Sequence, residues 1–534
     1  MTTDLATTLA AELAEAGADT VFGMPGGGNN LDFIGAAEAA GLRFVLAHGE
    51  TEAAIMASVY GDLTGTPPVC VVTRGPGAAS TVNGVANALL DRQQLVLITD
   101  AVSATDYRRI AHQRLDQRAL LGTVTKASAT VGTGDVAAAA RQAIATAMAD
   151  PPGPVHLDYD PAAMSSPPEP EIASADQDWT EADRLATLLR GARRPVVLLG
   201  VGARRVAGPV RALLDGSPVP VLMTYRAKGV IADSAANDAG LLTGATTEAP
   251  ILAAADLIIA IGVDSVELIP NAWPYPAPVV SIAGWTDTSP YLVPEVELVG
   301  DLDKLVALLA EHWPTVDWAP TAGNDHRDAE LARLQAAGAT VTGLAPQRVV
   351  RSARAAAPPG STATVDAGAH MLCAMSLWAA EDFDETVISS GLATMGFALP
   401  AAIGAALARP GRRVVCFTGD GGLGMCLGEL ETLNRLRLPV TVVVFNDSRL
   451  SLIAIKAKPD GNGGDNAIGY QDIDFATVAQ GYGLLARRAP TVADLDTALS
   501  AALRHDGPAL IDVRVDPSGY RDVLDVIRGQ RTSG

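Results

Sequence analysis

Two apolar runs that each end in polar residues constrain the fold of this chain more than any other feature. The β-branched run from Val414 to Thr418 predicts a buried parallel strand, and Gly419-Asp420-Gly421 follows it at once. After 24 further residues, a second apolar run ends at Asn446-Asp447. Because the carboxyl ends of parallel strands lie at one edge of a sheet, where ligands bind, we expect a doubly wound α/β domain with a polar site at that edge.

The residues at this edge suit a hard cation and a phosphate group. Glycines allow backbone N–H groups to approach an anion closely at the start of the next helix. A carboxylate from Asp420, an amide oxygen from Asn446 and phosphate oxygens are the kind of ligands that Mg²⁺ prefers. A Gly-Asp-Gly turn alone is common, so the interpretation depends on the complete pattern of turn, helix, strand and asparagine.

Composition narrows the class of protein. The chain has 534 residues, enough for roughly three domains at about 150 residues each. Hydrophobic residues make up 48% of the chain and charged residues 19%, which is typical of a globular protein. A formal net charge of −21 argues against a nucleic-acid partner.

Targeting and redox signals favour the cytoplasm. The first 17 residues predict an amphipathic helix and lack the basic start and apolar core of a signal peptide. No apolar run is long enough to predict a membrane span. The four cysteines are scattered and suggest no disulfide framework, which fits a reducing compartment.

The first and last thirds of the chain share one pattern. Residues 67–100 run through a strand, a glycine-rich turn, a helix and a second strand, and residues 412–447 repeat this order. The runs 153–161 and 507–517 both begin with Gly-Pro, end with Asp-Pro and look like closing strands. The pattern predicts parallel sheets with helices on both faces, and two related domains suggest a ligand between them. The alternative explanation is that all doubly wound domains share such a pattern, so that the similarity need not reflect a duplication.

A third α/β segment lies between these two. We therefore expect three doubly wound parallel-sheet domains, at residues 1–165, 180–318 and 343–534. In the middle domain, Gly200-Val201-Gly202 is similar to the start of a dinucleotide fingerprint, but Arg205 occupies the place of the third glycine. A nicotinamide oxidoreductase that uses this domain is therefore a weaker alternative function.

The pattern from Gly419 to Asn446 resembles the diphosphate-binding motif of thiamine-diphosphate (ThDP) enzymes. The resemblance covers nearly the whole chain, as pyrimidine-binding, middle Rossmann-like and diphosphate-binding domains in that order. It is strongest to the acetolactate synthase-like group, and it extends to benzoylformate decarboxylase and carboxyethylarginine synthase. It implies that Mg²⁺ is held by Asp420, Asn446 and the Ser448 carbonyl, and that the diphosphate is lined by Gly419, Gly421 and Gly422.

Glu50 is the residue of most interest in the first domain. It follows a strand and begins a helix in FVLAHGETEAAIMASVYGDLTG. Acids in the first turn of a helix are commonly explained by the helix dipole. Here, however, the paired alanines and the later Thr-Gly turn resemble the ThDP family, in which such a glutamate bonds the aminopyrimidine N1′ and promotes formation of the thiazolium carbanion. The resemblance makes Glu50 the catalytic glutamate, with Glu52 as its neighbour, and we expect Glu50 to be buried.

Other segments resemble further parts of the family's site. FGMPGGGNN (22–30) and TRGPGAAS (73–80) match turns near the pyrimidine, and a glutamine in HQRLDQRALLGTVTKAS (112–128) would face the substrate. DAGAHML (366–372) matches a loop at the diphosphate, and SSGLATMGFALPAAIGA (389–405) matches the segment that bends the cofactor around an apolar wedge. Taken singly, each segment is more often structural, and their order and spacing favour function. The implied site residues are Pro25, Gly26, Thr73, Asn83, Gln113, Gly368, Ala369, His370, Gly391, Leu392, Met395, Leu450, Ser451 and Ile453, with Glu50, Gln113 and His370 as the catalytic group.

The resemblance implies decarboxylation of a 2-oxo acid, after which the resulting enamine is protonated to release an aldehyde or adds to an acceptor carbonyl. Benzoylformate-type decarboxylases carry a histidine early in the first domain, and neither 23–30 nor 73–80 contains one. This favours an acetolactate synthase-like carboligase. The alternatives are a decarboxylase like those for benzoylformate, phenylpyruvate or sulfopyruvate, and an inactive paralogue that acts as a binding subunit. The intact Glu50, Asp420 and Asn446 argue against the inactive paralogue.

Several segments of this chain depart from the acetolactate synthase pattern. Acetolactate synthases with FAD carry a Gly-Met-His-Gly turn and an Ala-Arg-Phe-Asp-Asp segment, where this chain reads LLTGATTEAP and AIGVDSVEL, so FAD is not expected. Arg92-Gln93-Gln94 replaces the usual Ser-Val-Pro, so pyruvate is not assigned as the donor. The glycine-rich stretch Pro459 to Gly469 suggests a mobile flap over the pocket. The family implies a homodimer or homotetramer with each site shared between two chains, acting on a 2-oxo acid and an aldehyde or second 2-oxo acid.

Overall fold

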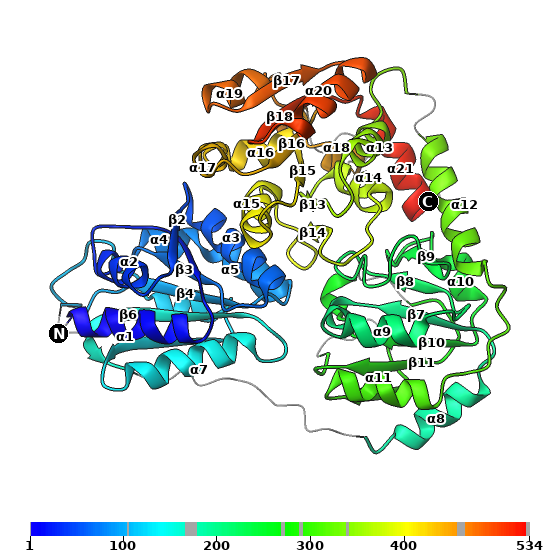
Figure 1. Ribbon diagram of the computed structural model, residues 1–534, viewed down its shortest axis with the longest axis horizontal. Helices are drawn as coiled ribbons and strands as arrows, with labels where there is room; N and C mark the ends of the chain where they lie inside the picture. Colours follow the sequence, from blue (N-terminus) through cyan, green and yellow to red (C-terminus); the bar gives the residue numbers. More distant parts are fainter. Residues whose placement is uncertain are drawn as a thin grey trace.

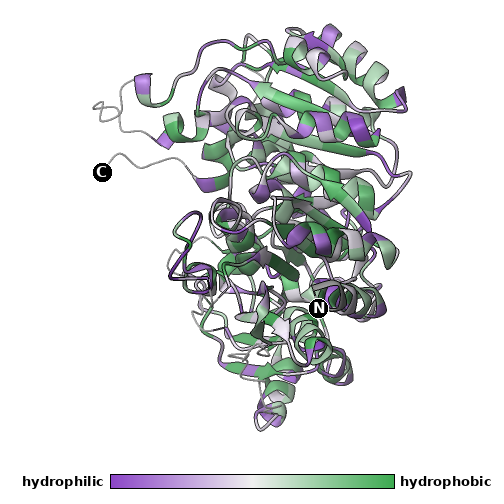
Figure 2. Ribbon diagram, turned by 90° about the vertical axis from the view of Figure 1, so that its left-hand side faces the viewer, coloured by the Kyte–Doolittle hydropathy of each residue, from purple (hydrophilic) through white to green (hydrophobic). Residues whose placement is uncertain are grey.

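Three α/β units, each built on a six-stranded parallel sheet, make up the protein (Figure 1). The computed structural model describes residues 2–103, 106–165, 179–268, 273–287, 292–337, 341–456 and 465–529. Helices flank each sheet, so the predicted fold class is confirmed. The hydrophobic colours of Figure 2 follow the strands, while hydrophilic residues gather on the outer helices and loops.

The first sheet has the strand order β2-β1-β3-β4-β6-β5. Its strands are β1 (Thr20–Met24), β2 (Arg43–Leu46), β3 (Val69–Val72), β4 (Leu95–Asp100), β5 (Ala127–Thr133) and β6 (Pro154–Met164). Its helices are α1 (Thr2–Glu15), α2 (Asn30–Ala39), α3 (Glu50–Thr64), α4 (Pro76–Ser80), α5 (Val82–Leu90), α6 (Gln117–Gly122) and α7 (Val136–Met148). The predicted amphipathic first helix is confirmed, because Leu5, Leu9 and Leu13 of α1 are buried.

The last sheet repeats this order strand for strand, as β14-β13-β15-β16-β18-β17. Its strands are β13 (Thr362–Val365), β14 (Thr386–Ile388), β15 (Val414–Gly419), β16 (Val440–Asn446), β17 (Leu485–Ala489) and β18 (Ala509–Arg514). Its helices are α13 (Pro346–Ala356), α14 (Ala369–Leu377), α15 (Ala398–Ala408), α16 (Asp420–Met425), α17 (Glu429–Leu436), α18 (Ser451–Lys456), η3 (Asp465–Ala467), α19 (Phe475–Gly481), α20 (Val492–Arg504) and α21 (Ser518–Arg528). The common order supports the internal duplication inferred from the sequence.

The middle sheet differs, with the order β12-β11-β10-β7-β8-β9. Counted from β9, this is the 3-2-1-4-5-6 order of a Rossmann-like sheet. Its strands are β7 (Pro195–Leu199), β8 (Val221–Met223), β9 (Asp238–Leu241), β10 (Leu257–Ile261), β11 (Val279–Ala283) and β12 (Val296–Val299). Its helices are α8 (Ala182–Gly191), η1 (Val201–Val206), α9 (Ala207–Leu214), α10 (Ala249–Ala253), η2 (Ser265–Glu267) and α11 (Leu302–Glu311).

Two helices pack the first and last units against each other. Side chains of α3 and α15 belong to one buried apolar cluster, and the two helices lie side by side in Figure 1. A Cβ at Gly404 of α15 would stand only 2.5 Å from the Met56 carbonyl oxygen of α3, so only glycine allows this close approach. The helix α12 (Ala322–Ala337) then links the middle unit to the last one, packing on β9 and α21. No helix in the described part of the chain combines the length and the apolar character needed to cross a membrane.

Candidate active site

The Asp420 carboxylate joins the ends of two neighbouring strands in the last sheet. Asp420 begins α16 directly after β15, and β15 pairs in parallel with β16. The carboxylate accepts hydrogen bonds from the backbone N–H groups of Gly421 at 2.7 Å and Ser448 at 2.6 Å. Burial raises the pKa of Asp420, and the N–H groups oppose that rise. The turn after β15 and the turn after β16 therefore lie at one edge of the sheet.

The oxygen atoms expected to hold a metal ion already have hydrogen-bond partners. Arg514, the last residue of β18, donates from Nη1 to Asn446 Oδ1 at 2.7 Å, and the Tyr470 N–H donates to the Ser448 carbonyl at 2.7 Å. An amide or carbonyl oxygen carries two lone pairs, so each keeps one for a cation. Together with the Asp420 carboxylate they form an all-oxygen set, which fits Mg²⁺. Within the described ranges, no cluster of three His, Cys, Asp or Glu side chains offers another metal site.

A cavity of about 240 Å³ opens at this edge of the sheet. It lies between the ends of β13 and β15, where the chain reverses its direction across the sheet, the place at which α/β sheets commonly bind ligands. Many of its lining residues come from the segments singled out in the sequence. These are Gly368, Ala369, His370, Met395, Gly419, Asp420, Gly421, Gly422, Leu450, Ser451 and Ile453. Asn446, Ser448, Gly391 and Leu392 are not part of the lining.

His370 presents an unused nitrogen in this cavity. The imidazole is buried and stacks on Phe445, with 5.2 Å between the ring centroids. Its Nε2 has no hydrogen-bond partner among the described residues. Burial lowers the pKa of His370 to about 4, so the ring is neutral near pH 7 and can donate or accept one hydrogen bond to a ligand.

Three side chains converge over Gly421. A Cβ at this position would stand 3.1 Å from Leu450 Cδ2 and 3.4 Å from Met395 Cε, and also 3.4 Å from the Tyr470 hydroxyl. Met395 is half-buried and lines the cavity from the segment before α15. The absence of a side chain at Gly421 therefore keeps space open beside the Met395 thioether.

Several residues at this edge were not predicted from the sequence. Asp366 is completely buried beneath the cavity, where it accepts hydrogen bonds from Thr418 Oγ1 at 2.8 Å and the Phe397 N–H at 3.2 Å. Burial raises the pKa of Asp366 to about 6. Asp447 and Tyr520 line the cavity itself. Asp447 follows Asn446 directly and could have been found by that signal, whereas no local pattern marks Tyr520.

The first unit holds Glu50 at its own sheet edge, away from this cavity. Glu50 begins α3, and its Oε1 lies 3.5 Å from the position that a Cβ at Gly77 would take. The expectation that Glu50 is buried is wrong for the single chain, in which the side chain is half-buried. The turn at Gly26 packs on Thr73, because a Cβ at Gly26 would overlap Thr73 Oγ1 at 2.3 Å. None of the residues given for the cavity lining comes from this unit.

Asn83 and Gln113 have structural neighbours in the same chain. Asn83 Nδ2 donates to Thr394 Oγ1 at 2.9 Å and so connects α5 to the segment before α15. In the same interface, a Cβ at Gly391 would stand 2.6 Å from the Leu90 carbonyl oxygen. Gln113 is exposed, with a positive φ of 57°. The residue that is buried nearby is Gln117, whose Oε1 accepts the Gly75 N–H at 2.7 Å and which the sequence did not single out.

A buried carboxylate of the last unit holds the turn before Glu50. Glu429 Oε1 accepts hydrogen bonds from the backbone N–H groups of His48 at 2.8 Å and Gly49 at 3.2 Å. Its Oε2 accepts from Thr432 Oγ1 at 2.7 Å, and burial raises the pKa of Glu429. The backbone that leads into Glu50 is thus fixed by α17.

The glycine pair of the middle unit has a packing role. A Cβ at Gly200 would stand 2.3 Å from Val263 Cα, and one at Gly202 would stand 2.9 Å from Gly262 Cα. These glycines therefore let the turn after β7 lie directly on the turn after β10. Nearby, Asp264 accepts from Arg92 Nε at 2.7 Å, which ties the unusual Arg92 to the middle unit.

Three family models match the chain in sequence order. The N-terminal TPP binding domain of thiamine pyrophosphate enzymes matches residues 3–120, the central domain matches 182–309, and the C-terminal TPP binding domain matches 366–513. These three segments follow the three sheets.

Comparisons over the whole length of the chain agree with these family models. The acetolactate synthase of Bacillus subtilis (strain 168) is 29% identical over 95% of this chain and 92% of that protein. The catabolic acetolactate synthase of Raoultella terrigena is 30% identical over 96% of this chain and 95% of that protein. Among solved structures, the thiamine diphosphate-dependent 4-hydroxybenzoylformate decarboxylase of Rhodococcus jostii RHA1 matches with a TM-score of 0.82 at 24% identity, over 96% of this chain and 99% of that chain, which shows a shared fold.

Proposed function

The chain belongs to the thiamine-diphosphate enzyme superfamily, in its acetolactate synthase-like group, and on this premise we propose that it is a carboligase. Its donor is a 2-oxo acid that loses CO₂, and the remaining acyl fragment is transferred to the carbonyl carbon of an aldehyde or a second 2-oxo acid. Thiamine diphosphate supplies, when bound, the carbanion that attacks the donor and the electron sink that allows CO₂ to leave.

The observation that carries this proposal is the 240 Å³ cavity with the unpartnered His370 nitrogen at the carboxyl edge of the last sheet. Asp420, Asn446 and Ser448 would hold Mg²⁺ through oxygens that keep a free lone pair. The backbone at Gly419 and Gly421 would lie along the diphosphate, since neither residue has a side chain to exclude it.

The chain's own residues would then orient the reactants and exclude water. His370, neutral near pH 7, would form one hydrogen bond with a bound ligand through Nε2. Met395, Leu450 and Ile453 would form an apolar wall around the reacting carbonyl. Such a wall favours an acceptor carbonyl over water as the species that meets the acyl fragment.

Glu50 would complete the site from a second copy of the chain. In one chain, the first unit contributes none of the residues given for the cavity lining, and the Glu50 carboxylate is half-buried at its own sheet edge. A homodimer, or a tetramer made of two such dimers, would bring Glu50 of one chain to the cavity of the other and bury it there. In that position the carboxylate would exchange a proton with the aminopyrimidine ring.

The surroundings of Glu50 favour transfer to a carbonyl over release of an aldehyde. Aldehyde release needs a proton donor at the acyl carbon, and residues 23–30 and 73–80 contain no histidine. His48 lies close to Glu50 in the chain, but its Nε2 is bonded to Glu431 Oε2 at 2.8 Å.

The test is to incubate the purified protein with ThDP, Mg²⁺ and a panel of 2-oxo acids, with and without aldehyde acceptors. Products are identified by mass spectrometry, and the Glu50→Gln variant is the control. A product that contains carbon from both donor and acceptor supports the proposal. Free aldehyde alone would replace it by a decarboxylase, and the absence of CO₂ release from every donor would reject both reactions.

A further inference from the structure

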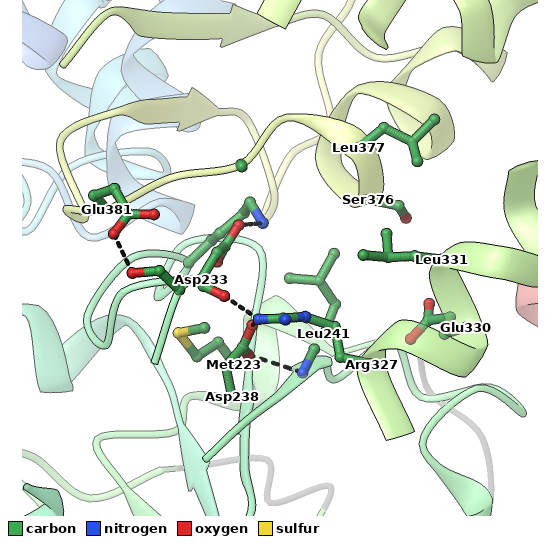
Figure 3. Close-up of a pocket in the computed structure, with 14 residues that line it drawn as sticks. Met223, Asp233, Asp238, Leu241, Arg327, Glu330, Leu331, Ser376, Leu377 and Glu381 are labelled. Carbon is green, nitrogen blue, oxygen red and sulfur yellow. Dashed lines mark hydrogen bonds and ion pairs between the residues drawn. The ribbon is translucent and has the colours of Figure 1, made fainter. Parts of the chain in front are cut away.

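A second cavity, of about 290 Å³, lies between the middle unit and the last unit (Figure 3). Its walls come from β8, β9 and the loop between them, from the linking helix α12, and from the C-terminal end of α14 with the segment that follows it. It shares none of its lining residues with the cavity at Asp420. The catalytic proposal therefore leaves it without a role.

Two ion pairs account for the positive charges in this cavity. Lys228 Nζ lies 2.6 Å from Asp233 Oδ2, and Arg327 Nη1 lies 3.0 Å from Asp238 Oδ2. Lys228 and Asp238 are both buried. Since each cation already has a carboxylate, an incoming anion would find no free positive partner.

Glu330 is a carboxylate without such a partner. It lines the cavity from α12, is only 5% exposed, and makes no hydrogen bond or ion pair with any described residue. The nearby Glu248 is buried too, but it accepts hydrogen bonds from Thr243 Oγ1 at 3.0 Å, Thr247 Oγ1 at 2.9 Å and the Ala245 N–H at 2.7 Å. Burying a carboxylate without a hydrogen-bond partner costs free energy. Glu248 avoids this cost through these hydrogen bonds, and Glu330 does not.

Glu381, a second acid of the lining without a cationic partner among the described residues, lies on the opposite side of the cavity from Glu330 (Figure 3). It is exposed and accepts a hydrogen bond from Ser234 Oγ. Counted formally, the lining has two cations and four anions, so the cavity carries two excess negative charges. Apolar side chains complete the wall beside Glu330, namely Leu241, Leu331 and Leu377.

We propose that this cavity binds a small organic cation, a protonated amine on a short apolar chain. The ammonium group donates to the Glu330 carboxylate, and the chain packs on Leu241, Leu331 and Leu377. A metal ion fits less well, because Glu330 stands alone and the described residues hold no cluster of three ligating side chains. A neutral ligand would leave the buried charge of Glu330 without a counter-ion.

The test compares three probes of equal chain length by calorimetric titration of the full-length protein, at about pH 8 so that Glu330 is ionised. The probes are n-butylamine hydrochloride, butan-1-ol and sodium butyrate. We expect the amine to bind with a Kd on the order of 1 mM and the other two to bind at least about tenfold more weakly. Equal binding of amine and alcohol, or no binding of the amine, would overturn the proposal.

Two variants distinguish a specific contact of the amine with Glu330 from a general effect of the cavity's negative charge. Glu330→Gln keeps the shape and removes the charge, and it should weaken amine binding at least about tenfold, since a charge-assisted hydrogen bond is lost. Glu381→Gln makes the same chemical change in the same cavity and should keep the affinity within about threefold. Unchanged binding in Glu330→Gln, or equal losses in both, would reject the assignment of the ammonium site.

A crystal soaked with n-butylamine hydrochloride gives an answer that does not depend on variants. The ammonium nitrogen should lie within about 3 Å of a Glu330 oxygen. Density for the amine only outside this cavity would overturn the proposal. Calorimetry and the soaked crystal both measure binding of the amine and not turnover. Their results therefore test this proposal whether or not the protein is a carboligase.

Discussion

Glu429 and His48 are 381 positions apart in the chain, yet the Glu429 carboxylate accepts the His48 backbone N–H at 2.8 Å. The bond lies two residues before Glu50 and joins the last unit to the first. The position of the proposed catalytic carboxylate therefore depends on a helix of a different unit in the same chain.

Replacing Glu429 by alanine should disturb this turn. The substitution leaves two backbone N–H groups without their acceptor, so we expect a loss of about 2 kcal/mol in the free energy of unfolding and a fall in kcat. Glu429→Gln, which keeps an acceptor oxygen, should restore much of both. The control is Glu431→Ala, where the bond to the His48 side chain is exposed and worth less than about 1 kcal/mol. Denaturant unfolding and steady-state kinetics measure the effects, and equal effects at both positions would contradict this role.

Glu50→Gln should separate binding from activation. The neutral side chain still fits, so ThDP affinity in calorimetry should stay within about threefold, while kcat should fall by about 100-fold or more because proton transfer is lost. Turnover like that of the unchanged protein would remove Glu50 from the mechanism.

If each active site is shared between two chains, as proposed, two inactive variants should complement each other. In a heterodimer of Glu50→Gln and Asp420→Ala chains, one site carries both changes and the other carries neither. A randomly reassociated equal mixture should recover about a quarter of the unchanged activity, because about half of the dimers are mixed and each has one intact site. No recovery in chains that demonstrably exchange would mean that each site lies within one chain.

Asp420→Ala should remove Mg²⁺-dependent ThDP binding. The carboxylate is the only charged group in the proposed ligand set, so ThDP affinity should fall by about 100-fold and lose its response to Mg²⁺. Asp447→Asn also removes a carboxylate from this cavity, where Asp447 bonds Ser451, and it should keep Mg²⁺-dependent binding. Calorimetry with and without Mg²⁺ decides between the two carboxylates.

Gly421→Ala should weaken cofactor binding with little loss of stability. The new methyl group would stand 3.1 Å from Leu450 Cδ2 and 3.4 Å from Met395 Cε, both of them flexible ends of side chains, and it would reduce the space in the cavity. We expect ThDP affinity to fall by about tenfold and the free energy of unfolding to change by less than about 1 kcal/mol. Gly424→Ala lies in the same short helix with nothing within 4 Å and should leave both unchanged.

Glu330 predicts a pH dependence of stability. Burial, aided by the negative charge of Glu248, raises its pKa from 4.5 to about 7 in the folded protein, while Arg333 and Lys228 oppose the rise. Since the folded state holds the proton more tightly, this group's contribution is fully present below pH 4.5 and is lost as the pH rises through about 7. The loss is about 3 kcal/mol or less. Urea unfolding at several pH values should show a flatter profile for Glu330→Gln, and an identical profile would contradict the assignment.

Strand ends and the turns that follow them could be predicted from the sequence, because these features depend on residues that are close together in the chain. β15 and β16 each end one residue after their apolar runs, and the segments from Gly368 to His370 and from Gly419 to Gly422 do line one cavity. Repeated strand and helix patterns also predicted the duplication that the two identical strand orders display.

Contacts between distant segments could not be predicted in this way. Three hydrogen bonds depend on how separate elements pack, and no spacing in the sequence encodes them. They join Arg514 to Asn446, Asn83 to Thr394, and the His48 N–H to Glu429. The packing role of Gly200 and Gly202 could not be predicted either, because their closest neighbours, Gly262 and Val263, lie about 60 positions further along the chain. The proposed flap at 459–469 lies largely outside the described residues.

The helix α14 is nine residues long, about 13 Å at the usual rise per residue. Its first turn, Ala369 to Met371, lines the proposed cofactor cavity, and its last residues, Ser376 and Leu377, line the cavity at Glu330. One rigid element thus forms part of two binding sites. If filling either site shifts this helix, an amine that changes the affinity for thiamine diphosphate must have its own affinity changed by thiamine diphosphate by the same factor, since thermodynamic linkage is reciprocal.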